Sequence, residues 1–191
     1  MVKRSIMSGI LIGIGTVIYL KCDNTYIGAM LFSLALITIV KCNLDLYTGK
    51  IGYFGEVKAS SLLIILVGNL IGVMMPVCFK YGDIFDKVVL ISSLKFSKDF
   101  LSIFLDGVLC GILMFVAVSC KDSLIIVFCI MTFMLSGYEH CIADFPYLVL
   151  NYSIENLQKF MLIILGNSIG SILTNRLMRR NYDNQRTERN P

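Results

Sequence analysis

The sequence IILVGNLIG, at residues 64–72, recurs as LIILGNSIG at residues 162–170. The two copies are 98 residues apart, so Asn69 corresponds to Asn167. The same offset aligns two further glycine-containing segments, SGILIGIG at 8–15 and DGVLCGIL at 106–113. Because four glycines and one asparagine coincide at a single offset, the sequence predicts an internal duplication.

The composition around these segments is that of a membrane protein. Of 191 residues, 57% are hydrophobic and only 16% are charged, whereas soluble domains are about one-quarter charged. The apolar segment after MVKR lacks a small-x-small cleavage site, so we expect it to remain as a membrane span.

Six apolar runs define the predicted spans. A helix needs about 20 apolar residues to cross the roughly 30 Å hydrocarbon core. Four runs nearly reach that length: 5–20, 60–79, 100–119 and 159–177. Two shorter runs, 25–40 and 123–135, lead directly into polar sequence and predict interrupted helices.

The duplication gives three spans to each repeat, over about 5–80 and 100–178. An odd number of spans turns the second repeat upside down, and inverted repeats with discontinuous helices are typical of transport proteins. We therefore predict an all-α integral membrane bundle of six helices, with an inverted 3+3 repeat and broken second and fifth helices, as a single domain over 1–191. Carried to the breaks, the offset pairs Cys42 with His140 and Tyr47 with Phe145.

The basic residues predict the orientation. With the N-terminus inside, eleven of the 17 lysines and arginines lie on the inner face, so we expect both termini in the cytoplasm. We expect the basic tail, residues 179–191, to contact anionic lipid headgroups rather than nucleic acid.

The segment SGYEHCIADF, at 136–145, contains the only histidine. Ionisable residues within a span are costly and usually face a pathway or a partner. His140 is either a neutral cap on its own broken helix or, as an imidazole able to carry a proton, part of a pathway. Glu139 lies on another helix face and is expected to give structural support, accepting N–H bonds or pairing at a subunit contact. Asp144, at i+4, could stabilise an imidazolium.

Three polar residues in the first break and the repeated motif are further candidates. Thr48, in DLYTGK at 45–50, could donate to an anion or satisfy its own backbone. Asn69 and Asn167 could bond across helices or contact a ligand.

Signals for enzymes and metal sites are missing. One histidine excludes an HExxH zinc site, and GxSxG and Walker motifs are absent. The seven cysteines include no CxxC pair. We therefore expect no catalytic activity, no metal and no cofactor.

The ordered set DLYTGK, GNLIG, GVLCGILMFVAV, SGYEHCIADF and LGNSIG resembles the formate/nitrite transporter family along the whole chain. The resemblance implies an aquaporin-like protomer with its own pore, assembled as a homopentamer in the cell membrane. It also implies a small monovalent anion or weak acid as the substrate, namely formate, nitrite or hydrosulfide.

The resemblance also assigns roles to single residues. It implies that His140, Thr48, Asn167 and the vestibule lysine, Lys95, line the substrate pore, with Glu139 and Asn69 as support. It further implies apolar constrictions on either side of His140, formed by Phe32, Leu36, Leu46 and Phe133. Three positions depart from the family's usual residues: Gly111 and Asp144 replace asparagine, and Tyr47 replaces phenylalanine.

These observations predict a channel or transporter, proton-linked through His140 or through water, or else conducting the bare anion past a neutral His140. The alternative from another class is a non-transporting membrane scaffold or hole-forming oligomer.

Overall fold

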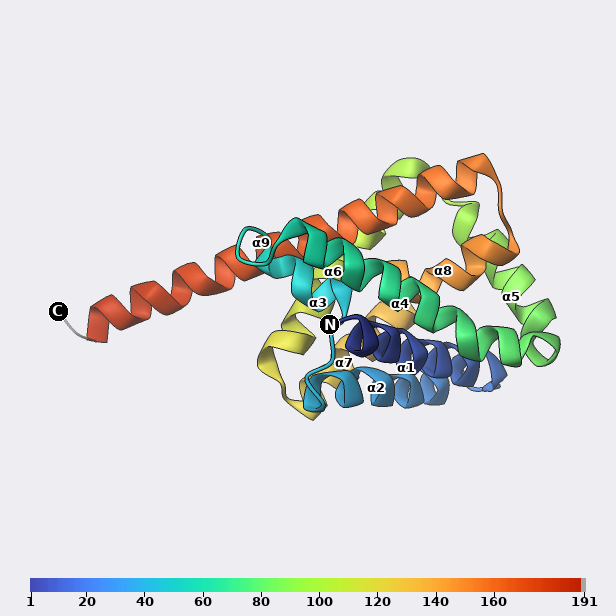
Figure 1. The fold of residues 1–191 in the computed structure, drawn as a ribbon, viewed down its shortest axis with the longest axis horizontal. Coiled ribbons are helices and arrows are strands. Elements are labelled where there is room, and N and C mark those ends of the chain that lie inside the picture. Colours follow the sequence, from blue (N-terminus) through green and yellow to red (C-terminus); the bar gives the residue numbers. More distant parts are fainter. Residues whose placement is uncertain (190–191) are drawn as a thin grey trace.

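The computed structural model describes the backbone of residues 1–189 and the side chains of residues 1–80 and 82–179. The helices are α1 (Val2–Lys21), α2 (Thr25–Lys41), α3 (Tyr47–Lys50), the 3₁₀ helix η1 (Ile51–Tyr53), α4 (Ala59–Phe79), α5 (Tyr81–Phe96), α6 (Phe100–Cys120), α7 (Ser123–Ser136), α8 (Cys141–Leu150) and α9 (Ile154–Arg189). Figure 1 shows them as one bundle, with α5 at the end opposite the projecting C-terminal part of α9.

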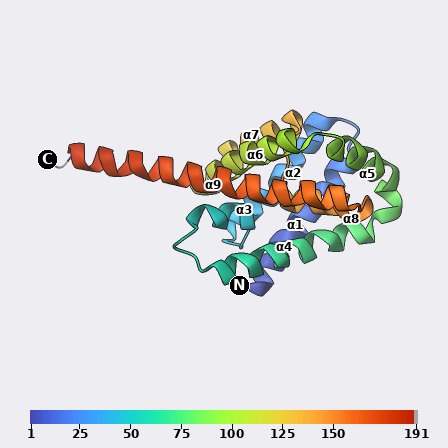
Figure 2. The ribbon, with the colours of Figure 1, turned by 90° about the horizontal axis from the view of Figure 1, so that it is seen from above.

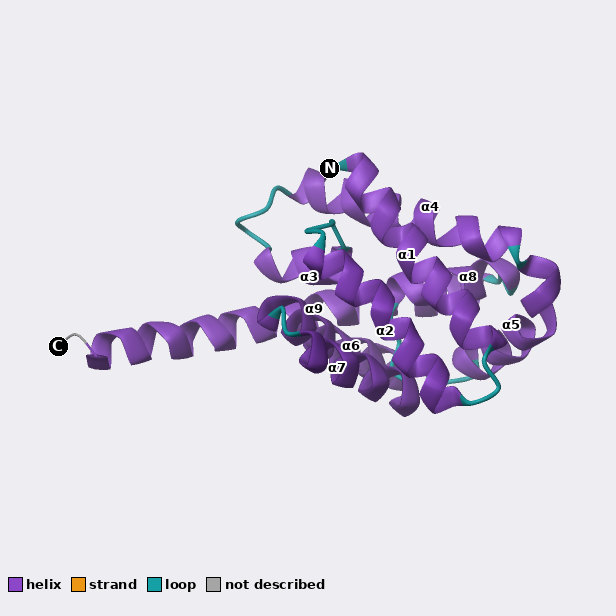
Figure 3. Cartoon of the chain, turned by 90° about the horizontal axis from the view of Figure 1, so that it is seen from below, coloured by secondary structure: helices purple, strands orange, loops and turns teal. Residues whose placement is uncertain are grey.

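Five helical segments among the described residues are long and apolar enough to cross a membrane: Val2–Lys21, Ala59–Phe79, Phe100–Cys120, Ser123–Leu150 and Ile154–Arg179. Thr25–Lys41 is a shorter apolar helix. The predicted all-helical class with several apolar helices is therefore confirmed. Figure 3 shows these helices joined by short loops.

The outward faces of these helices are apolar. On α4, Leu63 and Ile71 are exposed, as are Leu101 on α6 and Leu165 on α9. Exposed apolar surface of this extent is unusual for a soluble monomer. It is the surface that lipid or a neighbouring protomer would cover.

The two middle helices begin in the same way. The Asn24 side chain accepts hydrogen bonds from Tyr26 N and Ile27 N at the start of α2. The Asp122 side chain does the same for the start of α7. Such caps satisfy the free N–H groups of a first turn. Asn24 and Asp122 are 98 residues apart, so the helix starts follow the offset of the repeat.

Glycine allows the outer helices of each repeat to pack closely. α1 packs on α4, and α6 packs on α9. A Cβ added at Gly72 would collide with the carbonyl oxygen of Ile6 on α1, and one added at Gly170 with that of Val108 on α6. The repeated glycines therefore serve backbone-to-backbone contact in both repeats.

Each middle helix is interrupted and then restarts. α2 ends at Lys41 and the chain resumes as α3 at Tyr47, whereas α7 ends at Ser136 and resumes as α8 at Cys141. Gly137, with φ 69°, turns the chain out of α7. The half-helices α3 and α8 begin inside the bundle, where their first N–H groups need partners from the protein.

The repeated asparagines are those partners. Asn69 Oδ1 accepts from Tyr47 N at 2.8 Å, and its Nδ2 donates to Asp45 O and Ser5 O. Asn167 Oδ1 accepts from Cys141 N at 2.9 Å, and its Nδ2 donates to Glu139 O and Gly107 O. Each amide therefore bonds the first N–H of one half-helix and the carbonyl two residues earlier.

This equivalence corrects the predicted register at the breaks. Tyr47 corresponds to Cys141, an offset of 94, so the pairings of Cys42 with His140 and of Tyr47 with Phe145 are wrong. The reason is length: α2 has 17 residues and α7 has 14, and the segment that follows α2 is also one residue longer.

The C-terminal part of α9 runs away from the bundle (Figure 2). The headgroup contacts predicted for the basic tail, residues 179–191, fall almost wholly on side chains outside the described residues.

Candidate functional site

The two helix breaks meet at one hydrogen bond. Thr48 lies in the first turn of α3, and His140 is the N-cap residue of α8. Thr48 Oγ1 lies 3.2 Å from His140 Nε2, and both side chains are buried. A polar pair is thus held among apolar helices.

The backbone of α8 determines which nitrogen of His140 carries the proton. His140 Nδ1 accepts a hydrogen bond from Ala143 N at 3.2 Å, so it keeps its lone pair. A neutral imidazole then carries its proton on Nε2, and this N–H donates a hydrogen bond to Thr48 Oγ1. The predicted cap is present, and the structure adds a contact with the other break that was not predicted. An imidazolium would lose the Ala143 bond, because both ring nitrogens would be donors.

The backbone of Thr48 is held in place by Ser171 on α9. Ser171 Oγ lies 3.0 Å from Thr48 O and 3.1 Å from Gly111 O, which ties α3, α6 and α9 together. A Cβ at Gly111 would collide with the backbone of Asn167. A glycine at this position is therefore required by this close approach.

Two cavities lie on either side of the His140–Thr48 pair. The α5-side cavity, of about 250 Å³, is lined by residues that include Thr16, Phe32, Lys95, Phe133, Glu139 and Asp144. The α3-side cavity, of about 310 Å³, is lined by residues that include Arg4, Leu46, Gly49, Lys50, Tyr53 and Lys121. His140 and Thr48 line neither cavity, but Glu139, next to His140, lines the α5-side cavity and Gly49, next to Thr48, lines the α3-side cavity. The buried pair therefore lies between the two cavities, and we call its surroundings the closed region.

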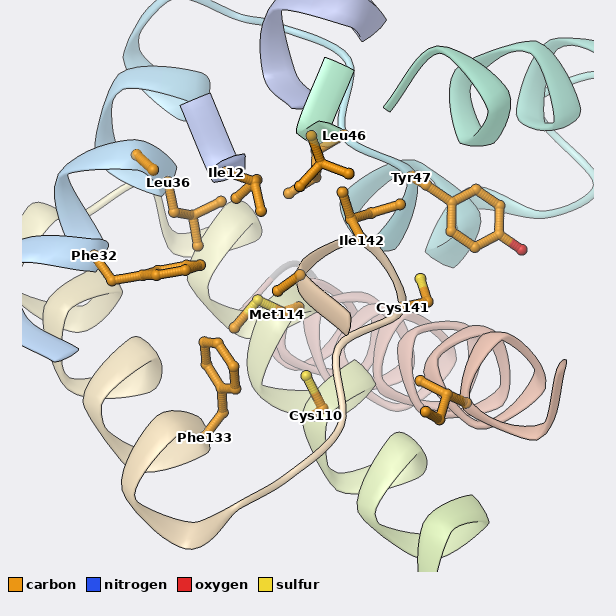
Figure 4. Packing of buried hydrophobic residues seen from close by; sticks show 14 of the residues in the cluster. Ile12, Phe32, Leu36, Leu46, Tyr47, Cys110, Met114, Phe133, Cys141 and Ile142 are labelled. Atoms are coloured by element: carbon orange, nitrogen blue, oxygen red, sulfur yellow. The ribbon is translucent and has the colours of Figure 1, made fainter. Parts of the chain in front are cut away.

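The apolar residues expected at constrictions surround this closed region. The rings of Phe32 and Phe133 meet edge to face with centroids 6.0 Å apart, and Phe133 lies 5.9 Å from the imidazole of His140. Figure 4 shows Phe32 opposite Phe133, with Leu36 and Leu46 nearby. Phe32 and Phe133 border the α5-side cavity and Leu46 the other, while Leu36 is fully buried.

Lys95 lies at the α5-side cavity, within a cluster of charges. Its Nζ is 2.5 Å from Glu139 Oε2 and 3.0 Å from Asp144 Oδ1. Burial lowers the pKa of Lys95, but the Asp144 and Glu139 carboxylates outweigh this and raise that pKa above its ordinary value. Lys95 is therefore charged and already paired.

Glu139 is also held by a second lysine that the sequence interpretation overlooked. Lys98 Nζ contacts Glu139 Oε1 at 2.7 Å, Asp106 Oδ2 at 2.6 Å and Gly137 O at 2.7 Å. Its position three residues after Lys95 was the available signal. Glu139 thus has a supporting position, but its partners are lysines of its own chain.

Asp144 does not serve as the predicted companion of His140. Its carboxylate pairs with Lys95, and only its backbone N–H bonds to His140, at the carbonyl oxygen. The helix continues past Pro146 to Leu150, although Pro146, as its sixth residue, lacks the N–H that would bond to the carbonyl oxygen of Ile142.

Asn167 was predicted to line the pore, and here the structure changes the interpretation. Its amide is fully buried and makes three bonds to backbone groups, as Asn69 does. Both donor hydrogens are used, so Asn167 holds the break in place rather than presenting a donor to a ligand. Within the described residues, no group of three or more His, Cys, Asp or Glu side chains is arranged to hold a metal ion.

Comparisons with known proteins match the chain along most of its length. A family model described as formate/nitrite transporter matches residues 1–179. A solved structure titled "FNT family ion channel" superposes with a TM-score of 0.77 at 20% identity, covering 95% of this chain and 89% of its own. A "Pentameric formate channel with formate bound" gives 0.71 at 21% identity, covering 94% and 93%. A comparison with curated proteins finds no match.

Proposed function

This chain belongs to the formate/nitrite transporter family, and we propose on that basis that it is a membrane channel or transporter for small monovalent anions or their conjugate acids. Formate, nitrite and hydrosulfide are the proposed substrates. The observation that supports this best is the pair of cavities separated by the Phe32–Phe133 contact and the His140–Thr48 hydrogen bond. A small solute entering either cavity meets the same closed polar centre.

The proposed arrangement has six membrane spans in two inverted repeats, as in the aquaporin-like architecture. The second span consists of α2 and α3, and the fifth of α7 and α8. The matching asparagine bonds to Tyr47 and Cys141 support this arrangement, because they show one structural device used in both halves. Freed backbone is tolerated at membrane depth when protein satisfies it.

The apolar constrictions formed by Phe32, Leu36, Leu46 and Phe133 favour the passage of a neutral species over that of an anion. Moving an isolated carboxylate into a medium of low dielectric constant costs tens of kcal/mol by Born estimates, and apolar side chains cannot replace the lost water. A neutral acid avoids most of that cost. In the closed region it would bond with the Nε2–H of His140 and the hydroxyl of Thr48.

Charge differs between the two cavities. Arg4, Lys50 and Lys121 line the α3-side cavity, and Asp45 is paired with the first two at 3.4 and 3.6 Å. The α5-side cavity has two lysines, Lys95 and Lys98, which pair with the two carboxyl groups that line it, Glu139 and Asp144. We propose that the α3-side cavity is the one that concentrates anions, since it holds more positive charge than negative.

The proton link expected through His140 has a cost in this geometry. Protonating Nδ1 would set two donors, the ring N–H and the Ala143 N–H, against each other. We therefore propose that His140 stays neutral and acts as a hydrogen-bond donor.

We also propose a homopentamer in the cell membrane with cytoplasmic termini. The similar fold of a structure described as a pentameric formate channel supports the assembly. The exposed apolar faces of α4, α6 and α9 supply surface for lipid and for neighbours. Arg4, Lys50 and Lys121 gather near the N-terminal end of α1, as expected for a cytoplasmic face.

Purified protein in liposomes tests the proposal. We expect uptake of formate, nitrite or hydrosulfide above that of empty liposomes, and a pentamer by native mass spectrometry. Absence of uptake for all three, by protein that is correctly folded and inserted, would overturn the transport proposal. That outcome would favour the non-transporting scaffold, for which the structure offers no specific support.

A further inference from the structure

Asp144 has one carboxylate oxygen that receives no hydrogen bond from the described residues. The side chain is 2% exposed and borders the α5-side cavity. Its Oδ1 pairs with Lys95, whereas its buried Oδ2 has no hydrogen-bond partner in the part of the chain that the structure describes. A buried, unpaired carboxylate oxygen is costly, so its presence beside a cavity needs a physical explanation.

The neighbouring carboxylate makes full ionisation more costly still. Glu139 Oε2 and Asp144 Oδ1 bind the same Lys95 Nζ, and the two carboxyl groups interact with each other. Two carboxylates that share one site favour a state in which one of them holds a proton. Protonation turns the unsatisfied oxygen into a donor.

The surrounding groups indicate which carboxylate takes the proton. Glu139 has two ammonium partners, Lys95 and Lys98, whereas Asp144 contacts one cation among the described side chains, Lys95. Other groups around this cluster, Tyr19, Cys110, Cys141 and Tyr147, are uncharged in their ordinary state, and the Asp106 carboxylate is paired with Lys98. The less compensated carboxylate is Asp144, so the proton belongs there.

We propose that Asp144 is the proton-holding residue of the α5-side cavity and exchanges that proton with the weak acid being transported. This proposal rests on the transport function and names the group that supplies the proton. When an anion in the α5-side cavity meets Asp144, the O–H bond of Asp144 breaks and an O–H or S–H bond forms on the anion, so that the neutral acid crosses the closed region. The Asp144 carboxylate stays paired with Lys95 and regains a proton from the aqueous solution. The reverse step accepts a proton from an entering acid.

With the proton supplied by Asp144, His140 can remain neutral and act as a hydrogen-bond donor. Its ring holds the substrate as a donor and keeps its bond with Ala143, while the proton comes from a residue that lines a water-accessible cavity. Asp144 therefore distinguishes this chain from relatives that have asparagine there, since an amide holds no exchangeable acid proton.

Two measurements test the proposal, and the first needs no transport. Infrared difference spectra at neutral pH should contain the band of a protonated buried carboxyl group, present in the wild type and in Asp83→Asn but lost in Asp144→Asn. Asp83 is a suitable control because it is half-exposed and paired with Lys21. A wild type without this band would overturn the proposal.

The second measurement follows formate uptake and internal pH together in liposomes. Wild type and Asp83→Asn should carry a proton with each formate and respond to a pH gradient, whereas Asp144→Asn should lose that dependence. Asp144→Glu should restore it and shift the infrared band, which covers the case in which the asparagine variant does not fold. Gradient dependence retained in Asp144→Asn would contradict the proposal. Failure of the wild type to take up formate at all would instead overturn the transport function.

Discussion

His140 Nε2 lies 3.2 Å from Thr48 Oγ1, and this bond joins two helix breaks that are 92 residues apart in sequence. Each residue sits at the start of a half-helix whose first N–H is held by an asparagine. The pair is therefore placed by the backbone of both repeats. Changes to the asparagines should alter the scaffold, and changes to the pair should alter passage through it.

Replacing the Thr48 hydroxyl should slow transport without unfolding the protein. Thr48→Val keeps the shape but removes the hydrogen bond to His140, worth about 0.5–1.5 kcal/mol. Initial formate uptake should therefore fall by about 2- to 10-fold, whereas Thr48→Ser should retain most of it. Equal uptake by Thr48→Val and wild type would show that the hydroxyl takes no part.

Asn69→Ala and Asn167→Ala should both destabilise the fold. Each change leaves one buried N–H and two carbonyls without their partner, and each such group costs about 1–3 kcal/mol. Thermal unfolding in mild detergent should show a large loss for both variants. Asn175→Ala, which removes a single bond to Gly52 O, is the matched control and should lose less. If Asn167 acted only as a ligand group, its variant would lose uptake with an unchanged melting temperature.

Added methyl groups should disturb the helix pairs at the repeated glycines. Gly72→Ala and Gly170→Ala force backbone apart at α1–α4 and α6–α9, at a cost of about 1–3 kcal/mol each. Gly82→Ala should be harmless, because nothing lies within 4 Å of its added Cβ. Detergent-solubilised yield and melting temperature measure the difference, and similar values for all three variants would contradict the packing explanation.

Removing the aromatic ring of Phe133 should widen the apolar constriction next to His140. Phe133→Ala deletes the ring that contacts both Phe32 and His140, so larger weak acids such as lactate should enter liposomes faster than through the wild type. Phe128→Ala, on the same helix but 61% exposed, should leave the size preference unchanged. A size preference that stays the same in Phe133→Ala would rule out this ring as the gate.

The charge on Lys95 should stabilise the protein over the neutral range. Because its pKa is raised in the fold, its contribution is fully present below the ordinary value of 10.5 and is lost as the pH rises through the folded value. The contribution of Lys95 to the melting temperature should therefore be constant from pH 6 to 9. It should fall only at strongly alkaline pH.

Lys95→Met tests that assignment. It removes one of the two cations of the charged Glu139 carboxylate, and removing one partner of a buried ion pair costs about 3–5 kcal/mol. The paired change Lys95→Met with Glu139→Gln should recover part of that loss. A neutral-pH melting temperature unaffected by Lys95→Met would contradict the ion-pair explanation.

The sequence by itself determined the apolar helices, the duplication and the candidates at its centre. These features are local, or repeat at a constant distance along the chain. The length of an apolar run predicts a helix, and Asn69 and Asn167 identify each other through their neighbours. His140 stood out because it is the only histidine and lies close to an apolar run.

Only the tertiary structure decided how the breaks align and which charges pair. Where α2 ends depends on contacts with other helices, so its longer course changed the local offset from 98 to 94. Lys95 meets Glu139 across 44 residues, and Asn167 reaches Cys141 across 26. The roles of Asn167 and Asp144 therefore followed from packing, because a buried polar group takes its function from the partners that folding brings to it.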